Sequence, residues 1–410
     1  MIDSHIADSP RKLYPWTALA VLTGLNLLNY IDRTVLFAVQ PLVQAEFQIS
    51  RTQVGYLTSA FLICYMISAP FTSPLAERYS RRRVIAVGAI FWSGLTLLTA
   101  VTHTYGELLL RHTLVGVGEA VFSTIAPTFV ADLFPQEKRG RILGIFYLAI
   151  PVGSATGYLL GGNLAPAHGW RFPFYIAAIP GFLLSLVMWF MPEPKRGHYD
   201  SPHSIARGGL GSLASNRGFI AVTLGMAMMT FSLGGLQVWM TAFLSQERGY
   251  TLESANTYFG AIIVINGILA SLIGGWLGDK LLPRIKSAYY FVSAFGMALG
   301  VPAMIVALYF RGPAMMPGIC IASFFLLLNM SPLNAALINS VSPHIRATAL
   351  AVNIFFIHIL GDVPSPTMMG YIADHGTLQN SFILPVAAMV LSSSILFYGM
   401  RFAPGNKATK

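Results

Sequence analysis

The sequence has little charge. Asp, Glu, Lys and Arg make up only 10% of its 410 residues, whereas 55% of the residues are hydrophobic. Soluble globular domains carry about 25% charged residues, so this composition excludes an ordinary soluble domain. The net charge of +10 would favour a nucleic-acid partner in a soluble protein, but in a membrane protein it matters first where basic residues lie relative to the spans. We therefore expect an all-α polytopic membrane protein without a nucleic-acid partner.

Cysteine is also scarce. The two cysteines, Cys64 and Cys320, both lie in apolar runs, which argues against a disulfide framework or a thiolate metal site. The chain has no His-Glu-x-x-His metal pair and no recognisable nucleophile–base motif. A membrane enzyme acting on lipid is the competing hypothesis from another functional class, and product analysis after incubation with a lysolipid would test it. We expect no enzyme activity, no metal and no cofactor.

Long apolar runs are abundant. Each is long enough for a tilted helix to cross a hydrocarbon core of about 30 Å. The mixed-charge N-terminus leads into the first run without a small-residue cleavage site, so we expect a retained span rather than a signal peptide. We place twelve spans, at residues 15–41, 53–75, 84–102, 107–131, 140–164, 171–191, 219–243, 255–277, 287–309, 315–340, 347–371 and 381–402.

The basic residues are distributed unevenly between the two sides of these spans. With the N-terminus in the cytoplasm, 20 of the 26 Lys and Arg residues fall in cytoplasmic segments and only four in outer segments. Because cytoplasmic loops carry the excess of Lys and Arg, this bias predicts that both termini are cytoplasmic. We expect a monomer in a bacterial inner membrane, in contact with membrane lipids.

The chain divides into two similar halves. Residues 192–218, rich in Pro, Gly, Ser and basic residues, form a predicted cytoplasmic linker between six-span halves at 1–191 and 219–410. The loop after the second span, 73–78, corresponds to residues 275–280 after the eighth, and residues 135–140 correspond to 343–347. This organisation resembles the major facilitator superfamily across essentially the whole chain. The resemblance implies a transporter whose two halves rock about a central site to give alternating access.

Ionisable residues inside the spans are the first candidates for function. Each costs roughly 2.5–3.5 kcal/mol at the centre of a span, so it persists where it pairs or lines a polar cavity. Arg111 lies about one turn below the outer surface, Glu119 lies about 12 Å deeper than Arg111, and Asp32 lies about 13 Å from the outer end of the first span. If the first and fourth spans are neighbours, as the resemblance implies, both carboxylates share one pocket with Arg33 and Arg111. Protonation of a carboxylate would then release an arginine to bind an anion.

Two other interpretations of these charged residues stay open. A static salt bridge between spans would place the same groups side by side without any coupling to protons. Arg111 lies about one turn from the outer surface and can instead snorkel to the membrane interface.

The eleventh predicted span is interrupted by one glycine and two prolines, Gly361, Pro364 and Pro366. Broken helices at membrane depth occur where the freed carbonyls face protein or a water-filled cavity. His358 and Asp362 are four residues apart and therefore share one helix face. Both are candidates for substrate contact, and an interhelical hydrogen bond is the alternative for His358.

The repeated loops suggest a cytoplasmic gate. Their acidic members, Glu77 and Asp279, can pair with Arg139 or Arg346 when the cytoplasmic side is closed and separate when it opens. Arg78, next to Glu77, belongs to the same predicted gate. The alternative is a basic cluster whose role ended when the chain was inserted into the membrane.

Several longer strings narrow the resemblance. Together they look like the Spinster family: Gly116–Ala120, Ser123–Thr128, Ala131–Pro135, Ile145–Ser154, Gly157–Tyr158 and His358–Pro366. This resemblance implies transport of lysolipids or sphingoid lipids. It places proton coupling on Asp32 and Glu119, headgroup contact on Arg33 and Arg111, and Tyr30 in the shared Tyr-x-Asp-Arg element.

We therefore expect a secondary transporter driven by a proton gradient. Its expected substrate is an amphiphilic lipid with an anionic or zwitterionic headgroup. The Tyr-x-Asp-Arg element also occurs in proton symporters of organic anions, so a small organic anion such as a sugar acid is the alternative substrate.

Overall fold

A computed structural model describes residues 9–196, 211–342 and 345–404 of the chain. Within these residues the regular structure is entirely helical, and no β-strand occurs. This confirms the predicted all-α fold.

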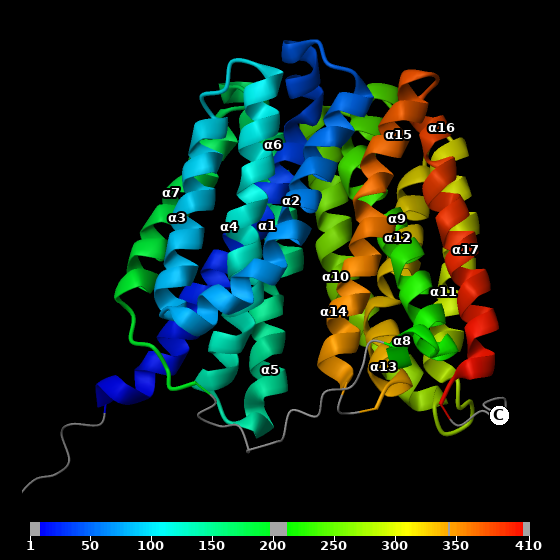
Figure 1. The fold of residues 1–410 in the computed structure, drawn as a ribbon. Helices are drawn as coiled ribbons and strands as arrows, with labels where there is room; N and C mark the ends of the chain where they lie inside the picture. The colour runs from blue at the N-terminus through cyan, green and yellow to red at the C-terminus, as the bar shows by residue number, and fades with distance from the viewer. Residues whose placement is uncertain (1–8, 197–210, 343–344, 405–410) are drawn as a thin grey trace, which may run out of the picture. The chain divides into compact units, whose positions relative to one another are not determined.

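The first seven helices follow one another with short connections (Figure 1). Their bounds are α1 (Ser9–Phe47), α2 (Arg51–Arg78), α3 (Arg81–Thr99), α4 (Tyr105–Leu133), α5 (Gln136–Tyr147), α6 (Ala149–His168) and α7 (Phe172–Phe190).

The remaining helices lie after residue 210. They are α8 (Gly211–Ala214), α9 (Arg217–Glu247), α10 (Leu252–Leu281), α11 (Ala288–Tyr309), α12 (Met315–Leu327), α13 (Met330–Ser340), α14 (Arg346–Ile357), η2 (His358–Asp362), α15 (Pro364–Asp374), α16 (Leu378–Ser381), α17 (Ile383–Gly399) and η3 (Met400–Phe402).

The helices account for all twelve predicted spans. Among the described residues, 11 helical stretches are long and apolar enough to cross a membrane, and α1 runs through the whole of the first predicted span, 15–41. Helix α1 extends six residues beyond its predicted span, 15–41, at each end, and α4 extends two residues beyond 107–131 at each end.

Proline explains two breaks inside the predicted spans. The fifth span is divided at Leu148, between α5 and α6, and the tenth at Leu328 and Asn329, between α12 and α13. Pro151 and Pro332 follow these breaks by three or four residues. Because proline has no N–H, it leaves a carbonyl four residues earlier without its helical donor, and its ring clashes with that carbonyl.

The chain forms two compact units. Unit 1 comprises residues 1–36 and 64–203, and unit 2 comprises residues 37–63 and 204–410. The C-terminal part of α1 and the N-terminal part of α2 thus belong to unit 2. The division into halves at residues 192–218 stays a prediction, because the units group residues by contact and not by internal repeat.

Glycines allow close helix packing in unit 1. A Cβ on Gly153 would lie 2.6 Å from the carbonyl oxygen of Leu27, and one on Gly157 would lie 2.8 Å from that of Ile31. These contacts hold α6 directly against the part of α1 that carries Asp32 and Arg33. The small residues of the fifth predicted span therefore pack tightly against α1.

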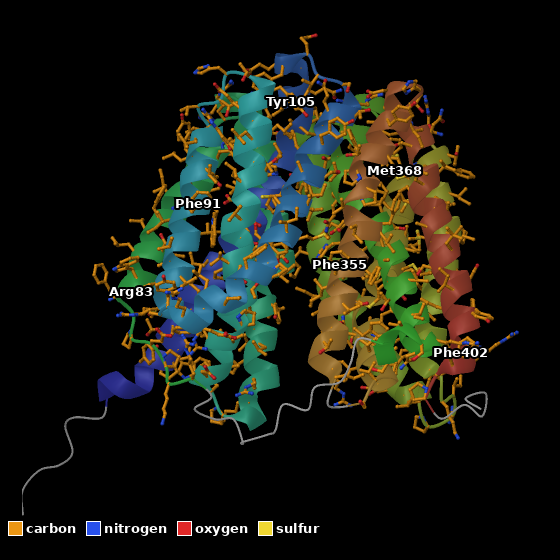
Figure 2. All side chains as sticks on the ribbon, viewed as in Figure 1. Arg83, Phe91, Tyr105, Phe355, Met368 and Phe402 are labelled. Atoms are coloured by element: carbon orange, nitrogen blue, oxygen red, sulfur yellow. The ribbon has the colours of Figure 1, made fainter. Side chains whose placement is uncertain are left out.

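In the same unit, α3 packs against α4 and α7. A Cβ on Gly118 would lie only 2.7 Å from the carbonyl oxygen of Gly88, so the two helix backbones approach closely at this crossing. Figure 2 shows Arg83 and Phe91 projecting from α3. The crossing fixes the depth at which Glu119, the residue after Gly118, enters the unit.

In unit 2, α9 packs against α17, α14 and η2. The indole N–H of Trp239 donates a hydrogen bond of 2.9 Å to the carbonyl of Pro366. A Cβ on Gly361 would lie 2.9 Å from the carbonyl oxygen of Ala227. The interrupted span is therefore held closely along α9.

Candidate functional site

Arg33 and Glu119 form a buried ion pair in unit 1. Arg33 Nε lies 2.6 Å from Glu119 Oε2, and the side chains are 18% and 0% exposed. The predicted meeting of these residues from the first and fourth spans is thus present in the structure. Taking two charges out of water is costly, and their attraction repays that cost only when the geometry is good.

Two aromatic rings hold the guanidinium of Arg33 in place. Its Cζ atom lies 5.0 Å from the ring centroid of Tyr30 and 5.2 Å from that of Tyr65. A cation over an aromatic face is attracted by the negative charge of the π-system, more strongly when water is excluded. The rings of Tyr30 and Tyr65 therefore both help to keep the Arg33 guanidinium in position. Tyr65, on α2, was missed from the sequence because a lone tyrosine in an apolar span carries no distinguishing pattern.

Asp32 points to a different helix from its neighbour Arg33. The hydroxyl of Thr96 on α3 donates a hydrogen bond of 3.0 Å to Asp32 Oδ2. The residue is 4% exposed, and its other oxygen, Oδ1, has no hydrogen-bond partner among the described residues. Thr96 was missed from the sequence, because threonines are common in spans and usually bond to their own helix.

Glu119 also has one oxygen without a hydrogen-bond partner in the described part of the chain, Oε1. An unsatisfied buried acceptor costs about 1–3 kcal/mol. A proton on a carboxyl group removes its charge and adds an O–H donor. Asp32 and Glu119 are therefore both chemically suited to take up a proton.

Arg111 does not join this group, which corrects the expectation of two carboxylates and two guanidiniums in one pocket. Its guanidinium donates to the carbonyl of Leu98 and, at 3.1 Å, to the hydroxyl of Thr102, and lies 3.6 Å from Glu107. The carbonyls of the last turn of α3 have no helical donors and accept such bonds readily. Both the snorkelling alternative and a role of Arg111 in substrate binding stay predictions.

His358 and Asp362 pair with each other in unit 2. His358 Nδ1 lies 2.9 Å from Asp362 Oδ1, and both side chains are about 20% exposed (21% and 20%). Their predicted placement on one helix face is confirmed. The partner seen for His358 is in its own helix, and its role in substrate contact stays a prediction.

The backbone around this pair is a π-helical turn, η2, where the N–H of Val363 bonds to the carbonyl of His358 at 3.1 Å. Pro364 and Pro366 cannot donate to the carbonyls four residues before them, so the α-helical pattern breaks here. Single π-turns inside α-helices occur frequently at functional sites. The turn places Asp362 against α9, where a Cβ on Gly234 would lie 2.7 Å from the Asp362 Cβ.

The residues of the predicted gate each have local surroundings. The side chain of Glu77 is exposed, and the backbone carbonyl of Glu77 accepts a hydrogen bond from Arg196 at 3.0 Å. The Asp279 carboxylate accepts a hydrogen bond from the Tyr289 hydroxyl at 2.7 Å. The three arginines of the predicted gate also have near neighbours. The Cζ atom of Arg78 lies 5.9 Å from the ring centroid of Tyr79, Arg139 donates a hydrogen bond to the carbonyl of Ala131 at 3.0 Å, and Arg346 donates one to the carbonyl of Ile338 at 3.3 Å. The gate stays a prediction.

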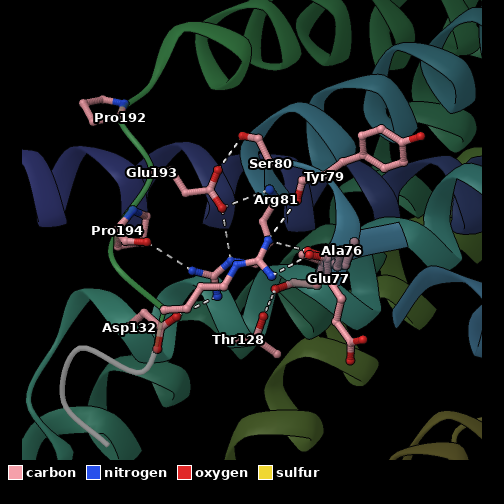
Figure 3. Close-up of polar contacts among 12 residues, drawn as sticks. Ala76, Glu77, Tyr79, Ser80, Arg81, Thr128, Asp132, Pro192, Glu193 and Pro194 are labelled. Atoms are coloured by element: carbon pink, nitrogen blue, oxygen red, sulfur yellow. Dashed lines mark hydrogen bonds and ion pairs between the residues drawn. The ribbon is translucent and has the colours of Figure 1, made fainter. Parts of the chain in front are cut away.

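A second buried ionic network centres on Arg81 (Figure 3). Arg81 Nη1 lies 2.6 Å from Asp132 Oδ2 at the end of α4, and its backbone N–H donates to Glu193 at 3.0 Å. Ser80 also donates to Glu193 through its hydroxyl. The network joins the start of α3, the end of α4 and the segment after α7.

Glu193 lies outside the membrane-spanning helices. Burial alone would raise its pKa, but the hydrogen bonds from Ser80 and Arg81 and the charge of Arg81 together bring the pKa below its ordinary value. The network was not predicted from the sequence, because Arg81 belongs to a run of basic residues between two spans and Asp132 to one of the strings that resemble the Spinster family. The only sequence signal was a carboxylate at the end of a span, on the side that carries the basic loops.

Comparison with known proteins shows the family to which the chain belongs. The profile of the Major Facilitator Superfamily matches residues 22–366. The chain is 34% identical over 396 residues to protein spinster homolog 3 of Danio rerio, covering 91% of this chain and 79% of that protein. It is 33% identical over 394 residues to the sphingosine-1-phosphate transporter SPNS2 of Danio rerio, covering 90% and 77% respectively.

A crystal structure of a bacterial homolog of the human lysosomal transporter Spinster has the same fold. Its TM-score is 0.86 at 23% identity, with 96% of this chain and 98% of that chain covered. These relatives are transporters and not enzymes. This chain belongs to the Spinster family of the major facilitator superfamily and is an integral membrane transporter.

Proposed function

We propose that this chain is a proton-coupled transporter of a lysolipid or sphingoid-type lipid with an anionic or zwitterionic headgroup. The observation that carries the proposal is the Arg33–Glu119 pair of 2.6 Å, with a second buried carboxyl group, Asp32, next to Arg33 in the sequence. A relative that is 33% identical bears the name of a sphingosine-1-phosphate transporter, which supports a lipid with a phosphate headgroup.

The proton acts on the pair through charge. When Glu119 is ionised, its carboxylate occupies the Nε–H of Arg33. When Glu119 is protonated, the guanidinium loses its anionic partner while the rings of Tyr30 and Tyr65 still hold it in place. A planar guanidinium with free N–H groups binds phosphate or carboxylate in a two-pronged geometry that lysine cannot provide. Proton uptake thereby prepares the site for an anionic headgroup.

Asp32 provides a second place for the proton. Its Oδ1 atom lacks a hydrogen-bond partner among the described residues, and Thr96 binds only Oδ2. Two carboxylates in one low-dielectric region repel each other, so a proton on one favours ionisation of the other. In this scheme, Asp32 and Glu119 exchange one proton as the substrate binds and leaves.

Uptake into proteoliposomes across an imposed pH gradient tests this proposal. Sphingosine-1-phosphate, a lysophospholipid and a sugar acid are supplied separately to the wild type and to Glu119→Gln. We expect gradient-driven uptake of the lipids in the wild type, loss of that uptake in Glu119→Gln, and partial retention of lipid exchange. Glu107→Gln is the matched control, since Glu107 lies on the same helix with its side chain 41% exposed.

Two results would contradict the proposal. Accumulation of the sugar acid without binding of, or competition by, the lipids would assign a small organic anion as the substrate. Full gradient-driven uptake in Glu119→Gln would reduce the Arg33–Glu119 pair to a static link between α1 and α4.

A further inference from the structure

Unit 1 has a groove on its surface between α3 and α4, near the end of α2. Its volume is about 430 Å³, and its lining includes Leu75, Val87, Gly88, Phe91, Gly118 and Val121. The groove is therefore almost entirely apolar along its length. It is separate from the buried site around Arg33 and Glu119, none of whose residues lines it.

The floor of the groove follows from the close crossing of α3 and α4. Gly88 and Gly118 have no side chains that would hold the helices apart, and a Cβ on Gly88 would lie 3.0 Å from Val121 Cγ1. Val87 and Phe91 stand at its edge and are 54% and 43% exposed. On a helix that spans a membrane, exposed apolar side chains of this kind face lipid.

Three successive arginines with different partners begin α3, and the third of them lines the groove. Arg81 is neutralised by Asp132 and Glu193. Arg82 donates only to the uncharged carbonyls of Trp189 and Met191.

The third arginine, Arg83, lines the groove and stacks on the ring of Trp189 at 6.0 Å. Its guanidinium has no hydrogen-bond acceptor within residues 9–196, 211–342 and 345–404, and it is exposed. Arg83 thus places a positive charge in the lining of the groove, and neither Arg83 nor its neighbour Arg82 forms an ion pair with a carboxylate among the described residues.

We propose that this groove binds an anionic phospholipid of the surrounding bilayer, with the phosphate on Arg83 and one acyl chain along Val87 and Phe91. Residues 83, 87 and 91 follow at intervals of four, so they lie along one face of α3 over about 12 Å. Figure 2 shows Arg83 and Phe91 on that helix. Tyr79 and Trp189 mark the level of the headgroups at the arginine end, as aromatic residues do at membrane interfaces.

Charge decides between lipid classes. A zwitterionic lipid offers the same phosphate but brings its own cation close to Arg82 and Arg83. An anionic lipid such as phosphatidylglycerol balances those charges, and its phosphate suits the free guanidinium of Arg83. The bound chain lies over the crossing of Gly88 and Gly118 and braces α3 against α4.

Native mass spectrometry of the delipidated, detergent-purified full chain tests the proposal. Palmitoyl-oleoyl phosphatidylglycerol and palmitoyl-oleoyl phosphatidylcholine are titrated separately. We expect tighter binding of the first phosphatidylglycerol molecule than of phosphatidylcholine. Arg83→Gln should weaken phosphatidylglycerol binding about fivefold, the usual effect of one basic residue at an anionic lipid surface. Val87→Trp, which fills the groove, should weaken binding of both lipids.

Arg284→Gln is the control, because Arg284 is an exposed arginine of the loop between α10 and α11 that lines no part of the groove. It should bind both lipids as the wild type does. Wild-type binding in both Arg83→Gln and Val87→Trp would overturn the proposal, and so would an equal loss in Arg284→Gln. Both groove positions are exposed, so neither substitution should unfold the protein. Thermal melting in detergent checks that each variant is folded.

Discussion

Arg33 pairs with Glu119, 86 positions later in the chain, while its neighbour in sequence, Asp32, accepts a hydrogen bond from Thr96 on α3. Successive side chains on a helix point about 100° apart, so two adjacent charged residues point toward different neighbouring helices. One turn of α1 thus brings a carboxylate to α3 and a guanidinium to α4. In the proposed function, the proton and the anionic headgroup therefore act on adjacent but distinct groups.

The first prediction concerns Asp32. Replacing it with Asn keeps the acceptor for the Thr96 hydroxyl but removes the site that can take up a proton. We expect Asp32→Asn to abolish lipid uptake driven by a pH gradient and to leave lipid exchange partly intact. Transport into proteoliposomes with and without the gradient measures both quantities. Thr96→Val, which removes only the hydrogen bond, should retain gradient-driven uptake; equal losses in the two variants would point to a structural role.

The second prediction concerns the stability of the ion pair. Removing one partner of a buried pair leaves an uncompensated charge and costs about 3–5 kcal/mol, whereas replacing both partners with apolar groups is often nearly neutral. Arg33→Met should therefore lower the thermal stability in detergent strongly. The double variant Arg33→Met/Glu119→Met should recover most of the loss. Additive losses in the double-mutant cycle would show that the two residues are not coupled.

Much of the fold could be predicted from the sequence, because span length and the position of proline act locally. The twelve apolar runs had to be helical to satisfy their backbone in a bilayer, and Pro364 and Pro366 had to disturb the helix before them. The Arg33–Glu119 pair could be predicted because isolated charges in spans are too costly to keep.

The missed parts depend on tertiary contacts between groups that carry no local pattern. Tyr65 and Thr96 are neutral residues of kinds common in membrane helices, and only the packed structure shows that they contact Arg33 and Asp32. Arg111 was placed wrongly because the carbonyls at the end of α3 are nearer to it than Glu119 is. The depth of a residue in its span predicts its level in the membrane but not its partner.

The third prediction concerns the N-terminal end of α2. The carboxylate of Asp374, the last residue of α15, accepts the backbone N–H groups of Arg51 and Thr52, each at 2.8 Å, and the Thr52 hydroxyl at 2.6 Å. Losing such a helix cap costs about 0.5–2 kcal/mol. Asp374→Ala should therefore speed amide hydrogen exchange in the first turn of α2.

Glu253→Ala is the control for this measurement, since Glu253 is an exposed carboxylate in the first turn of α10. It should leave exchange in α2 unchanged. Unaltered exchange at Arg51 and Thr52 in Asp374→Ala would mean that the cap contributes nothing to α2 in solution.

The fourth prediction concerns the proposed gate. The side chain of Glu77 is exposed, so closure of the cytoplasmic side can bring it to Arg139 or Arg346. Glu77→Gln removes the charge that would favour closure and should raise access from the cytoplasm. The labelling rate of a cysteine introduced at Lys138, in a background without Cys64 and Cys320, measures this access. An unchanged rate relative to Glu253→Gln would count against the gate.

The fifth prediction is a pH dependence that Glu193 imposes on stability. Burial opposes ionisation of Glu193, but its hydrogen bonds from Ser80 and Arg81 and the charge of Arg81 outweigh burial, so its pKa in the folded protein lies below the ordinary value of about 4.3. A lowered pKa stabilises the folded state above the ordinary pKa, and this stabilisation is lost as the pH falls through the folded value. The wild type should therefore melt above Glu193→Gln at pH 7, and the difference should shrink below about pH 4. A difference that does not change with pH in detergent melting curves would assign it to lost packing and not to charge.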